Sequence, residues 1–288
     1  MHFVDAKTLL TTKYNGMNIY RGCSHGCVYC DSRSTCYQFT HPFEDIEVKQ
    51  NAPDLLEQIL RSKRKKAVIG TGSMCDPYQH CEKELLLMRR CLEIIERYGF
   101  GASVITKSDL VLRDMDLFRS INEKAKAVIQ MTLTVADEEL SSVLEPNVCS
   151  TRRRYEVLKE FQKSGIPTIV WLSPIQPYIT DNMENIITLL DYCFDAGVKG
   201  IICFGIGMTL RSGNREYYYN ALDRHFPGLR KKYESRYKDA YEVASDNSKD
   251  LMRLFHSKCE KRSILHNPEE CFRYIAEWRE RYQQMSFL

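Results

Sequence analysis

Near its N-terminus the chain reads Gly22-Cys23-Ser24-His25-Gly26-Cys27-Val28-Tyr29-Cys30, which places three cysteines at the spacing C-x3-C-x2-C. The motif directly follows a strand that the sequence predicts near residues 17–21. Three thiolates on one glycine-bearing loop can converge on a single metal centre. A four-iron cluster takes one thiolate per iron, so three cysteines leave one iron open to a small molecule. The spacing is therefore much more specific than an isolated C-x2-C pair.

Two other metal sites fit the same residues. A structural zinc could be held by Cys23, Cys27, Cys30 and either His25 or Cys36. An electron-transfer cluster with four cysteines would be completed by Cys36, which lies six residues beyond Cys30. Cys36 could equally be a neighbouring thiol with no ligand role.

The remaining cysteines do not form a comparable group. The chain has 12 cysteines in 288 residues, about 4%, well below the roughly 8–10% of a short disulfide scaffold. In a chain without an export signal thiols stay reduced, so metal binding, catalysis or core packing explains them better than disulfides. We expect Cys91, Cys193 and Cys203, which lie in apolar stretches, to fill the core. No role is assigned to Cys81, Cys149, Cys259 and Cys271.

The overall composition is that of a globular α/β protein. There are 41 basic and 38 acidic residues, a net charge of +3, 43% hydrophobic and 27% charged residues. The length allows one large domain or two small ones. No apolar run approaches the roughly 18 residues of a membrane span, and the first residues do not resemble a signal peptide. We therefore expect a cytoplasmic protein with no membrane partner.

Strand-like and helix-like patterns alternate along the first 208 residues. Leu85, Met88, Leu92 and Ile95 recur at helical spacing before Gly99, which suits the end of a helix. Such segments separate short β-branched runs, which indicates a parallel sheet with crossover helices. With the first strand there are about six βα units, which fit a partial (β/α)6 barrel of the TIM type better than a closed barrel of eight. The β-branched runs are 67–70, 102–106, 127–133, 166–172 and 200–204.

Two further helices complete the barrel pattern. One is expected to start with Thr151 as N-cap and to stop at Gly165, and another to run from Asn182 to Gly197. We expect residues 1–208 to form the barrel and residues 209–288, which are rich in charge and tyrosine, to form a mainly helical extension packed on it.

One helix of the extension has a clear start signal. Asn267-Pro268-Glu269-Glu270 combines an N-cap, a proline at the first helical position and acidic residues in the first turn. Its expected apolar face is Phe272, Ile275, Trp278 and Tyr282.

The cysteine motif and the six βα units together resemble the radical S-adenosylmethionine (radical SAM) superfamily. Four segments also resemble, in order and spacing, its spore photoproduct lyase-like branch, often described as DNA repair photolyases. They are residues 22–30, Gly72-Ser73-Met74-Cys75-Asp76-Pro77-Tyr78-Gln79, Ile105-Thr106-Lys107-Ser108 and Leu144-Glu145-Pro146. The resemblance covers residues 17 to 208.

The resemblance implies an enzyme with two cofactors. Cys23, Cys27 and Cys30 would hold a 4Fe-4S cluster, and the fourth iron would bind the amino and carboxylate groups of S-adenosylmethionine. One electron, from a donor such as a flavodoxin or a ferredoxin, then cleaves a carbon–sulfur bond. The resulting 5′-deoxyadenosyl radical abstracts a hydrogen atom from the substrate. The cofactors carry this chemistry, while the protein supplies binding and orientation.

The same resemblance suggests which residues contact the cofactors. Tyr29 matches an aromatic residue next to the adenine, Asp76 an acid suited to the ribose hydroxyls, and Lys107 a lysine that reaches the cofactor carboxylate. Thr132 matches a hydroxyl residue near the cofactor. All follow or end predicted strands, where barrel active sites assemble. Taken singly, a strand-end lysine is usually a solvated charge, and a threonine in an apolar strand usually reflects β-propensity.

Three positions depart from the lyase. The lyase has a cysteine that returns a hydrogen atom to the product, and the matching residue here is Ser73, which we expect at the cofactor site. Cys75, two residues later, stands where the family usually has a hydroxyl residue, so it is either a catalytic hydrogen donor or a harmless replacement. Asp31 replaces a tyrosine that follows the third cysteine in the lyase. We therefore expect the cofactor chemistry to be retained and the substrate to differ.

Nucleic acid is one candidate substrate. The net charge of +3 and the pI near 8.2 are mild for a nucleic-acid binder. Basic groups at 61–66, 152–154 and in the tyrosine-rich tail could meet phosphates and unstacked bases. However, 61–66 lies at a predicted helix end, where a solvated basic face is the ordinary explanation. The alternative to an enzyme is a non-catalytic iron–sulfur or zinc module that binds nucleic acid.

Overall fold

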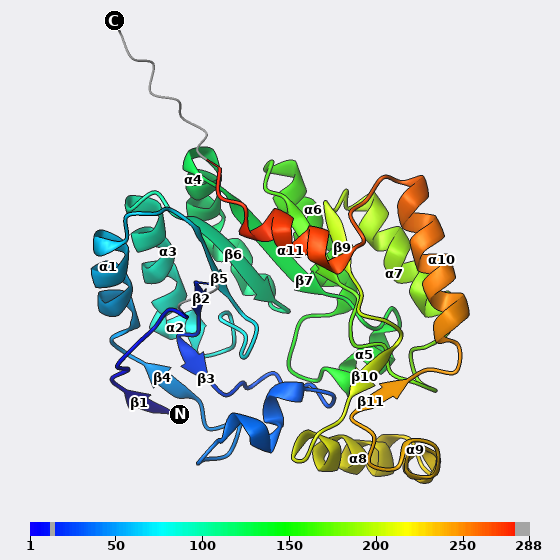
Figure 1. Ribbon diagram of the computed structural model, residues 1–288. Coiled ribbons are helices and arrows are strands. Elements are labelled where there is room, and N and C mark those ends of the chain that lie inside the picture. Colours follow the sequence, from blue (N-terminus) through cyan, green and yellow to red (C-terminus); the bar gives the residue numbers. More distant parts are fainter. Residues whose placement is uncertain (12–14, 280–288) are drawn as a thin grey trace, which may run out of the picture.

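Six parallel strands form the main sheet of the protein, which is a computed structural model describing residues 1–11 and 15–279. The strands pair in chain order, and the two edge strands do not pair with each other, so the barrel is open (Figure 1). This confirms the predicted partial (β/α)6 barrel. The strands are β2 (Gly16–Met17), β5 (Val68–Thr71), β6 (Gly101–Thr106), β7 (Ala127–Thr132), β8 (Thr168–Trp171) and β9 (Gly200–Ile202).

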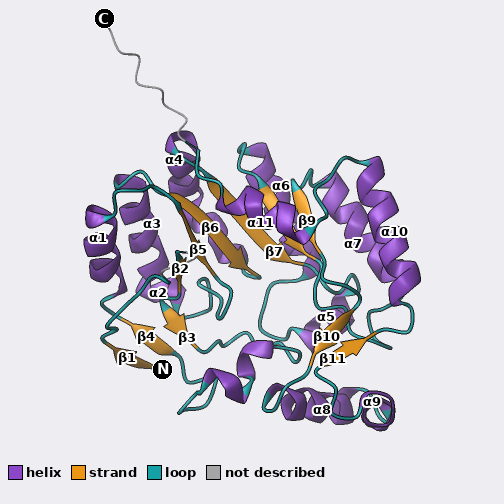
Figure 2. Cartoon of the chain, viewed as in Figure 1, coloured by secondary structure: helices purple, strands orange, loops and turns teal. Residues whose placement is uncertain are grey.

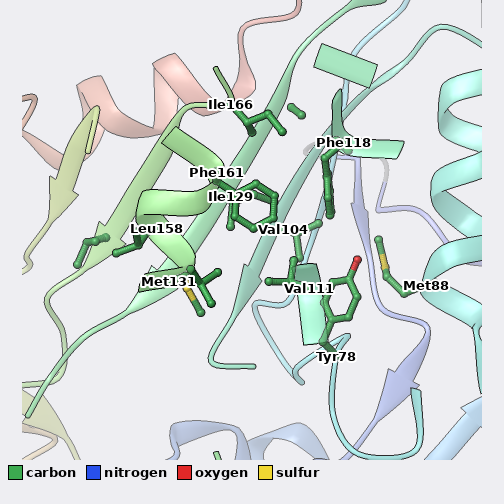
Figure 3. Close-up of a cluster of buried hydrophobic side chains, with 14 of the residues drawn as sticks. Tyr78, Met88, Val104, Val111, Phe118, Ile129, Met131, Leu158, Phe161 and Ile166 are labelled. Atoms are coloured by element: carbon green, nitrogen blue, oxygen red, sulfur yellow. The ribbon is translucent and has the colours of Figure 1, made fainter. Parts of the chain in front are cut away.

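Helices connect these strands and cover one face of the sheet (Figure 2). Between the two layers lies the main core, in which Val104, Ile129 and Met131 of the strands meet Phe118 and Phe161 of the helices (Figure 3). Burying each such side chain stabilises the fold by about 1.5–3 kcal/mol. The helices are α1 (Ala52–Ser62), α2 (Glu82–Leu85), α3 (Leu87–Arg97), α4 (Met115–Lys124), α5 (Glu138–Leu144), α6 (Thr151–Lys163) and α7 (Met183–Asp195).

The predicted first strand is wrong as a single element. Gly16 and Met17 pair with β5, whereas Tyr20 and Arg21 form β3 (Tyr20–Arg21) in a separate sheet of order β1-β4-β3. The chain changes sheet because the Lys49 amide donates to the Ile19 carbonyl and the buried Tyr20 hydroxyl donates to Glu82 at 2.5 Å. The other two strands of this small sheet are β1 (His2–Val4) and β4 (Glu47–Lys49).

Two helix ends show which local signals act. Gly99 has φ +65° two residues after the end of α3. Its amide donates to the Glu96 carbonyl and the Phe100 amide donates to the Ile95 carbonyl, which is a Schellman motif. This confirms the predicted helix end, although Leu85 belongs to α2. The predicted N-cap Thr151 is wrong: the Ser150 hydroxyl accepts from the Arg153 amide. Thr151 is buried and donates to the Val135 carbonyl instead.

Up to residue 279, the last that the structure describes, the C-terminal part contains four helices and one antiparallel strand pair. Strand β10 spans the predicted boundary at residue 208, so the division into two units stays a prediction. Tyr218, Tyr219, Tyr233 and Tyr237 are buried together and form a second core. The elements are β10 (Gly207–Thr209), α8 (Asn214–His225), α9 (Leu229–Tyr237), β11 (Glu242–Ala244), α10 (Ser248–Lys261) and α11 (Pro268–Ala276).

Helix α11 lies across the sheet in front of β7 and β9 (Figure 1). The Asn267 side chain accepts from the amides of Glu269 and Glu270, which confirms the predicted cap. The predicted apolar face is partly wrong. Cys271 is the fully buried residue, because α11 packs it against Gly200, whereas Phe272 is 41% exposed. Trp278 lies beyond the helix end, and Tyr282 lies outside the described residues.

Cys91, Cys193 and Cys203 are buried in the core, as predicted, and Cys259 is buried there as well. Among the described residues, no helix combines the length and the apolar character that crossing a membrane requires.

Candidate active site

One cavity of about 700 Å³ lies where the carboxyl ends of the barrel strands meet. The cysteine loop, the segment after β5 and the ends of β6 and β7 all contribute side chains to it. Such a position is typical of barrel active sites. The nine predicted site residues all line it: Cys23, Cys27, Tyr29, Cys30, Ser73, Cys75, Asp76, Lys107 and Thr132. The structure thus brings the predicted residues together, while the role of each stays a prediction.

The backbone of the cysteine loop is held by neighbouring carbonyl groups. Gly22 has φ +88°, and a Cβ atom there would lie 2.5 Å from the Phe43 carbonyl oxygen, so only glycine fits. The same carbonyl accepts from the Cys23 amide at 3.1 Å. Further along, the Val28 amide donates to Leu144 at 2.9 Å.

Two amide side chains hold the other side of this loop. The buried Gln79 accepts from the Ser24 amide at 3.0 Å and donates to the Gly22 carbonyl at 3.4 Å. Asn147 donates through its side chain to the Ser24 carbonyl and through its backbone to the His25 carbonyl. Segments 72–79 and 144–147 therefore position the cysteine loop as well as lining or flanking the cavity.

The three thiol sulfurs do not all lie within 4.8 Å of one another. Among the described residues, the single set of three metal-binding groups whose ligand atoms all lie within 4.8 Å of one another is elsewhere, at His2, His41 and Glu47. Four sulfurs around a tetrahedral zinc at 2.3 Å would lie about 3.8 Å apart. In a four-iron cluster each thiolate would bind a different iron, so the three sulfurs need not converge as closely as they would on zinc.

The chemical state of the thiols also bears on metal binding. Burial raises the pKa of the Cys27 thiol to about 12, so cluster binding, which needs thiolates, is coupled to proton release. Cys36 is exposed, does not line the cavity and accepts from Arg211 Nη1 at 3.2 Å. The Cys36 thiol therefore lies outside the cavity that Cys23, Cys27 and Cys30 line.

The buried ion pair of Glu145 and Arg154 holds the Tyr29 hydroxyl in place. The Tyr29 hydroxyl donates to the Glu145 carboxylate, and Arg154 forms an ion pair with that carboxylate. Arg154 also donates to the Thr132 carbonyl at 2.8 Å. Burial raises the pKa of Glu145, but the Arg154 and Lys107 charges lower it by more, so the pKa lies below its ordinary value. The network thereby ties the cysteine loop to the end of β7.

Sequence reasoning missed this network. Glu145 occurs in the matched segment Leu144-Glu145-Pro146, but Arg154 lies in the basic run 152–154, for which the sequence suggests contact with phosphates. In the structure Arg154 is 0% exposed and belongs to the protein interior.

The Asp76 carboxylate is largely occupied by protein donors. Its Oδ1 accepts from the Thr106 hydroxyl at 2.7 Å and the Tyr78 amide at 2.8 Å. Its Oδ2 accepts from the Lys107 amide at 2.7 Å and lies 3.4 Å from His25 Nδ1. A carboxylate offers about four acceptor positions, so Asp76 chiefly positions the end of β6. Its predicted contact with a ribose would use the remaining position.

Lys107 presents a cation to the cavity. Its Nζ lies 5.7 Å from the centre of the Tyr29 ring. Burial alone would lower the pKa of this amine, but the Cys27 and Glu145 groups more than compensate, and the pKa is raised. A compact ammonium group with three donors suits a carboxylate ligand.

Ser73 and Cys75 differ in accessibility. Ser73 is exposed in the cavity, whereas Cys75 is buried and its thiol donates to the Tyr20 carbonyl at 2.9 Å. Burial raises the pKa of Cys75 to about 12. Cys75 therefore keeps its S–H hydrogen at neutral pH.

Aromatic rings gather at the mouth of the cavity, a feature that sequence reasoning did not identify. Trp171 and Phe204 line the cavity, their ring centres are 5.8 Å apart, and Phe204 is 61% exposed. Phe272 of α11 stacks on Phe204 at 6.1 Å. The indole of Trp171 donates to Gln130 at 2.8 Å, and Gln130 donates to Ser103 at 2.7 Å, so three strands hold the indole in place.

The basic runs at 61–66 and 152–154 do not line the cavity. Residues 61–66 lie at the end of α1, with Arg61 in its last turn, as predicted. Arg153 pairs with Asp109 and Glu160. The tail tyrosines 218, 219, 233 and 237 are buried rather than available to bases.

The curated relatives of this chain are uncharacterized proteins. One from Mycobacterium tuberculosis is 29% identical over 228 residues, which is 77% of this chain and 66% of that protein. One from Methanocaldococcus jannaschii is 36% identical over 175 residues, 59% of this chain and 63% of that protein. The chain thus spans about two thirds of the length of the curated relatives it matches.

Solved structures share the fold. Spore photoproduct lyase complexed with dinucleoside spore photoproduct has a TM-score of 0.66 and 14% identity, covering 92% of this chain and 80% of that chain. A radical S-adenosylmethionine methyltransferase from Kitasatospora setae, with tryptophan substrate and a SAM analog bound, has a TM-score of 0.51 and 13% identity, covering 73% and 38%. The Radical SAM superfamily matches residues 17–190, more than half of the chain. Because this match runs from the cysteine loop through the strand ends that build the cavity, the chain belongs to the Radical SAM superfamily.

Proposed function

We propose that the chain is an enzyme that binds a 4Fe-4S cluster through Cys23, Cys27 and Cys30, and S-adenosylmethionine beside it. The observation that carries this proposal is that nine residues from separate segments line one cavity. When bound and reduced by a flavodoxin- or ferredoxin-type donor, these cofactors supply a 5′-deoxyadenosyl radical that abstracts a hydrogen atom from the substrate.

The side chains around the cavity would bind and orient S-adenosylmethionine. The Lys107 ammonium would pair with the cofactor carboxylate, and the Tyr29 ring, fixed through its hydroxyl by Glu145, would contact the adenine. The Thr132 and Ser73 hydroxyls, which both line the cavity, would offer hydrogen bonds. Asp76 holds the backbone of Lys107 and offers its remaining acceptor position to the ribose.

Cys75 is the proposed source of a returned hydrogen atom. Its pKa is raised to about 12 by burial, so the thiol remains protonated at neutral pH. It lines the cavity. Transfer of its S–H hydrogen to the product radical would leave a Cys75 thiyl radical, which would regain a hydrogen atom from 5′-deoxyadenosine and so regenerate the 5′-deoxyadenosyl radical. Ser73 cannot readily perform this role, so efficient repair of spore photoproduct is not expected.

The aromatic mouth supports a substrate with a planar ring, and we propose an unstacked nucleobase of nucleic acid. Phe204 is exposed beside Trp171, and a base stacked on an aromatic side chain gains about 1–3 kcal/mol. The structurally similar lyase is complexed with a dinucleoside. Binding of single-stranded DNA should weaken as salt rises, because phosphate contacts release counterions. An absence of binding at low salt would contradict the nucleobase proposal and leave the cofactor chemistry intact.

Anaerobic purification and cluster reconstitution test the enzyme itself. The holoenzyme should be brown, contain about four irons per chain and release 5′-deoxyadenosine from S-adenosylmethionine when reduced with dithionite. Cys27→Ala should lose both properties. The matched control Cys36→Ser should keep them, because Cys36 does not line the cavity. Stoichiometric zinc in a colourless protein without 5′-deoxyadenosine release would contradict the proposal and favour a binding module.

A further inference from the structure

Two histidines and a glutamate meet at the small sheet, away from the cysteine loop. His2 lies in β1, Glu47 in β4 and His41 in the loop that leads to β4. The register of the parallel pair β1 and β4 places His2 opposite Glu47. The ligand atoms of the three residues lie within 4.8 Å of one another, and no other set of three meets this criterion among the described residues.

Hydrogen bonds leave one lone pair free on each imidazole. His2 Nδ1 lies 3.0 Å from Asp45 Oδ2, and His41 Nδ1 lies 3.0 Å from the Pro42 carbonyl oxygen. Because both partners are acceptors, each ring carries its proton on Nδ1 and a lone pair on Nε2. His41 Nε2 is buried without a hydrogen-bond partner and lies 3.7 Å from Glu47 Oε2.

We propose that His2, His41 and Glu47 form a second metal site, which binds Zn²⁺ or a chemically similar divalent cation. Two imidazoles and one carboxylate are a known zinc ligand set, with water in the fourth position. Metal-binding histidines usually donate their other N–H to a carboxylate or a backbone carbonyl, as Asp45 and Pro42 allow here. A cation would also satisfy the buried lone pair of His41 and separate it from the Glu47 carboxylate.

A cation at His2, His41 and Glu47 would help to fix the backbone at Cys23. Phe43 lies between His41 and Glu47 in the chain, and its carbonyl accepts from the Cys23 amide at 3.1 Å. A cation that joins both ends of this loop to β1 would hold the carbonyl in place. We expect it to stabilise the fold and to increase cluster incorporation, while taking no part in the radical chemistry.

Zinc binding can be measured independently of the cluster. In the full chain with Cys23, Cys27 and Cys30 replaced by serine, the cysteine loop no longer offers thiolates. Titration with Zn²⁺ should show one site, and Co²⁺ should give the visible absorption of a tetrahedral complex. His41→Ala and Glu47→Gln should each weaken binding by at least 100-fold. Asp45→Asn should weaken it by about 10–100-fold, because Asp45 orients His2 through Oδ2 without being a ligand, while its Oδ1 pairs with the Met1 ammonium group at 2.7 Å.

A second histidine pair provides the matched control. His256 and His266 lie with ring centres 5.3 Å apart, but they belong to no three-residue ligand set among the described residues. His256→Ala should therefore bind Zn²⁺ as tightly as the parent. Circular dichroism of each variant checks that it folds. An absence of Zn²⁺ binding in the parent, or equal affinity in the folded His41→Ala variant, would overturn the proposal. Zinc alongside iron in the purified holoenzyme, lost in His41→Ala but not in His256→Ala, would support it.

Discussion

Replacing Arg154 by methionine would leave the Glu145 carboxylate buried without its cation. Arg154 is 0% and Glu145 1% exposed. Removing one partner of such a pair costs about 3–5 kcal/mol, because the other charge stays uncompensated. For a domain near 200 residues this corresponds to a fall in Tm of roughly 6–20 °C. The double variant with Glu145→Gln removes the uncompensated charge and should recover much of this stability.

The loss should depend on pH with a defined sign. In the parent, the pKa of Glu145 lies below its ordinary value of 4.5, since Arg154 and Lys107 outweigh the effect of burial. The ionised Glu145 carboxylate therefore contributes its full stabilisation of the fold above pH 4.5, and this contribution is lost as the pH falls through the lowered pKa. Without Arg154, burial should raise the pKa above 4.5. Folding then takes up a proton, so stability falls as the pH rises, by up to about 1.4 kcal/mol per pH unit.

Urea unfolding of the cluster-free protein at pH 5, 6 and 7, followed by circular dichroism, measures this effect. The pH-dependent part of the difference between parent and Arg154→Met should be under about 1 kcal/mol at pH 5 and reach about 3 kcal/mol at pH 7. An equal difference at pH 5 and pH 7, together with a double variant no more stable than the single one, would refute the reasoning. Arg154 would then act through packing alone.

Three further predictions concern the loop, the cofactor and the substrate. Gly22→Ala should lower both the stability and the iron content of the protein, because the new Cβ would meet the Phe43 carbonyl. Gly99→Ala is the control: Gly99 also has a positive φ but faces open space, so the substitution should cost only about 1–2 kcal/mol of stability. Equal losses of stability in urea unfolding would contradict this prediction. Lys107→Met should raise the KM for S-adenosylmethionine at least tenfold, measured by 5′-deoxyadenosine release, with unchanged iron content; an unchanged KM would remove Lys107 from the site. Phe204→Ala should weaken binding of single-stranded DNA by about 5- to 150-fold, measured by fluorescence anisotropy. Phe3 is an exposed aromatic residue on β1, and Phe3→Ala should leave DNA binding unchanged. A similar loss of affinity in both variants would argue against stacking of a base on Phe204.

Much of the fold was predictable because its signals are local. Short β-branched runs match five of the six strands of the main sheet, and Asn267 caps α11 as its position before a proline and two acids predicts. The spacing of Cys23, Cys27 and Cys30 likewise indicates a shared centre before any contact is known. Such signals depend on residues only a few positions apart, so they can be read from the chain alone.

The sequence by itself determined the partial barrel, the cysteine loop and the residues that should surround a cofactor. Only the tertiary structure decided that Arg154 is an interior partner of Glu145 and that four tyrosines of the C-terminal part, 218, 219, 233 and 237, are buried together. It also decided that Phe204 and Trp171 both line the cavity. The tertiary structure also placed the ligand atoms of His2, His41 and Glu47 within 4.8 Å of one another. The physical reason is that burial, hydrogen-bond partners and strand register arise between segments far apart in the chain, and local periodicity carries no information about those contacts.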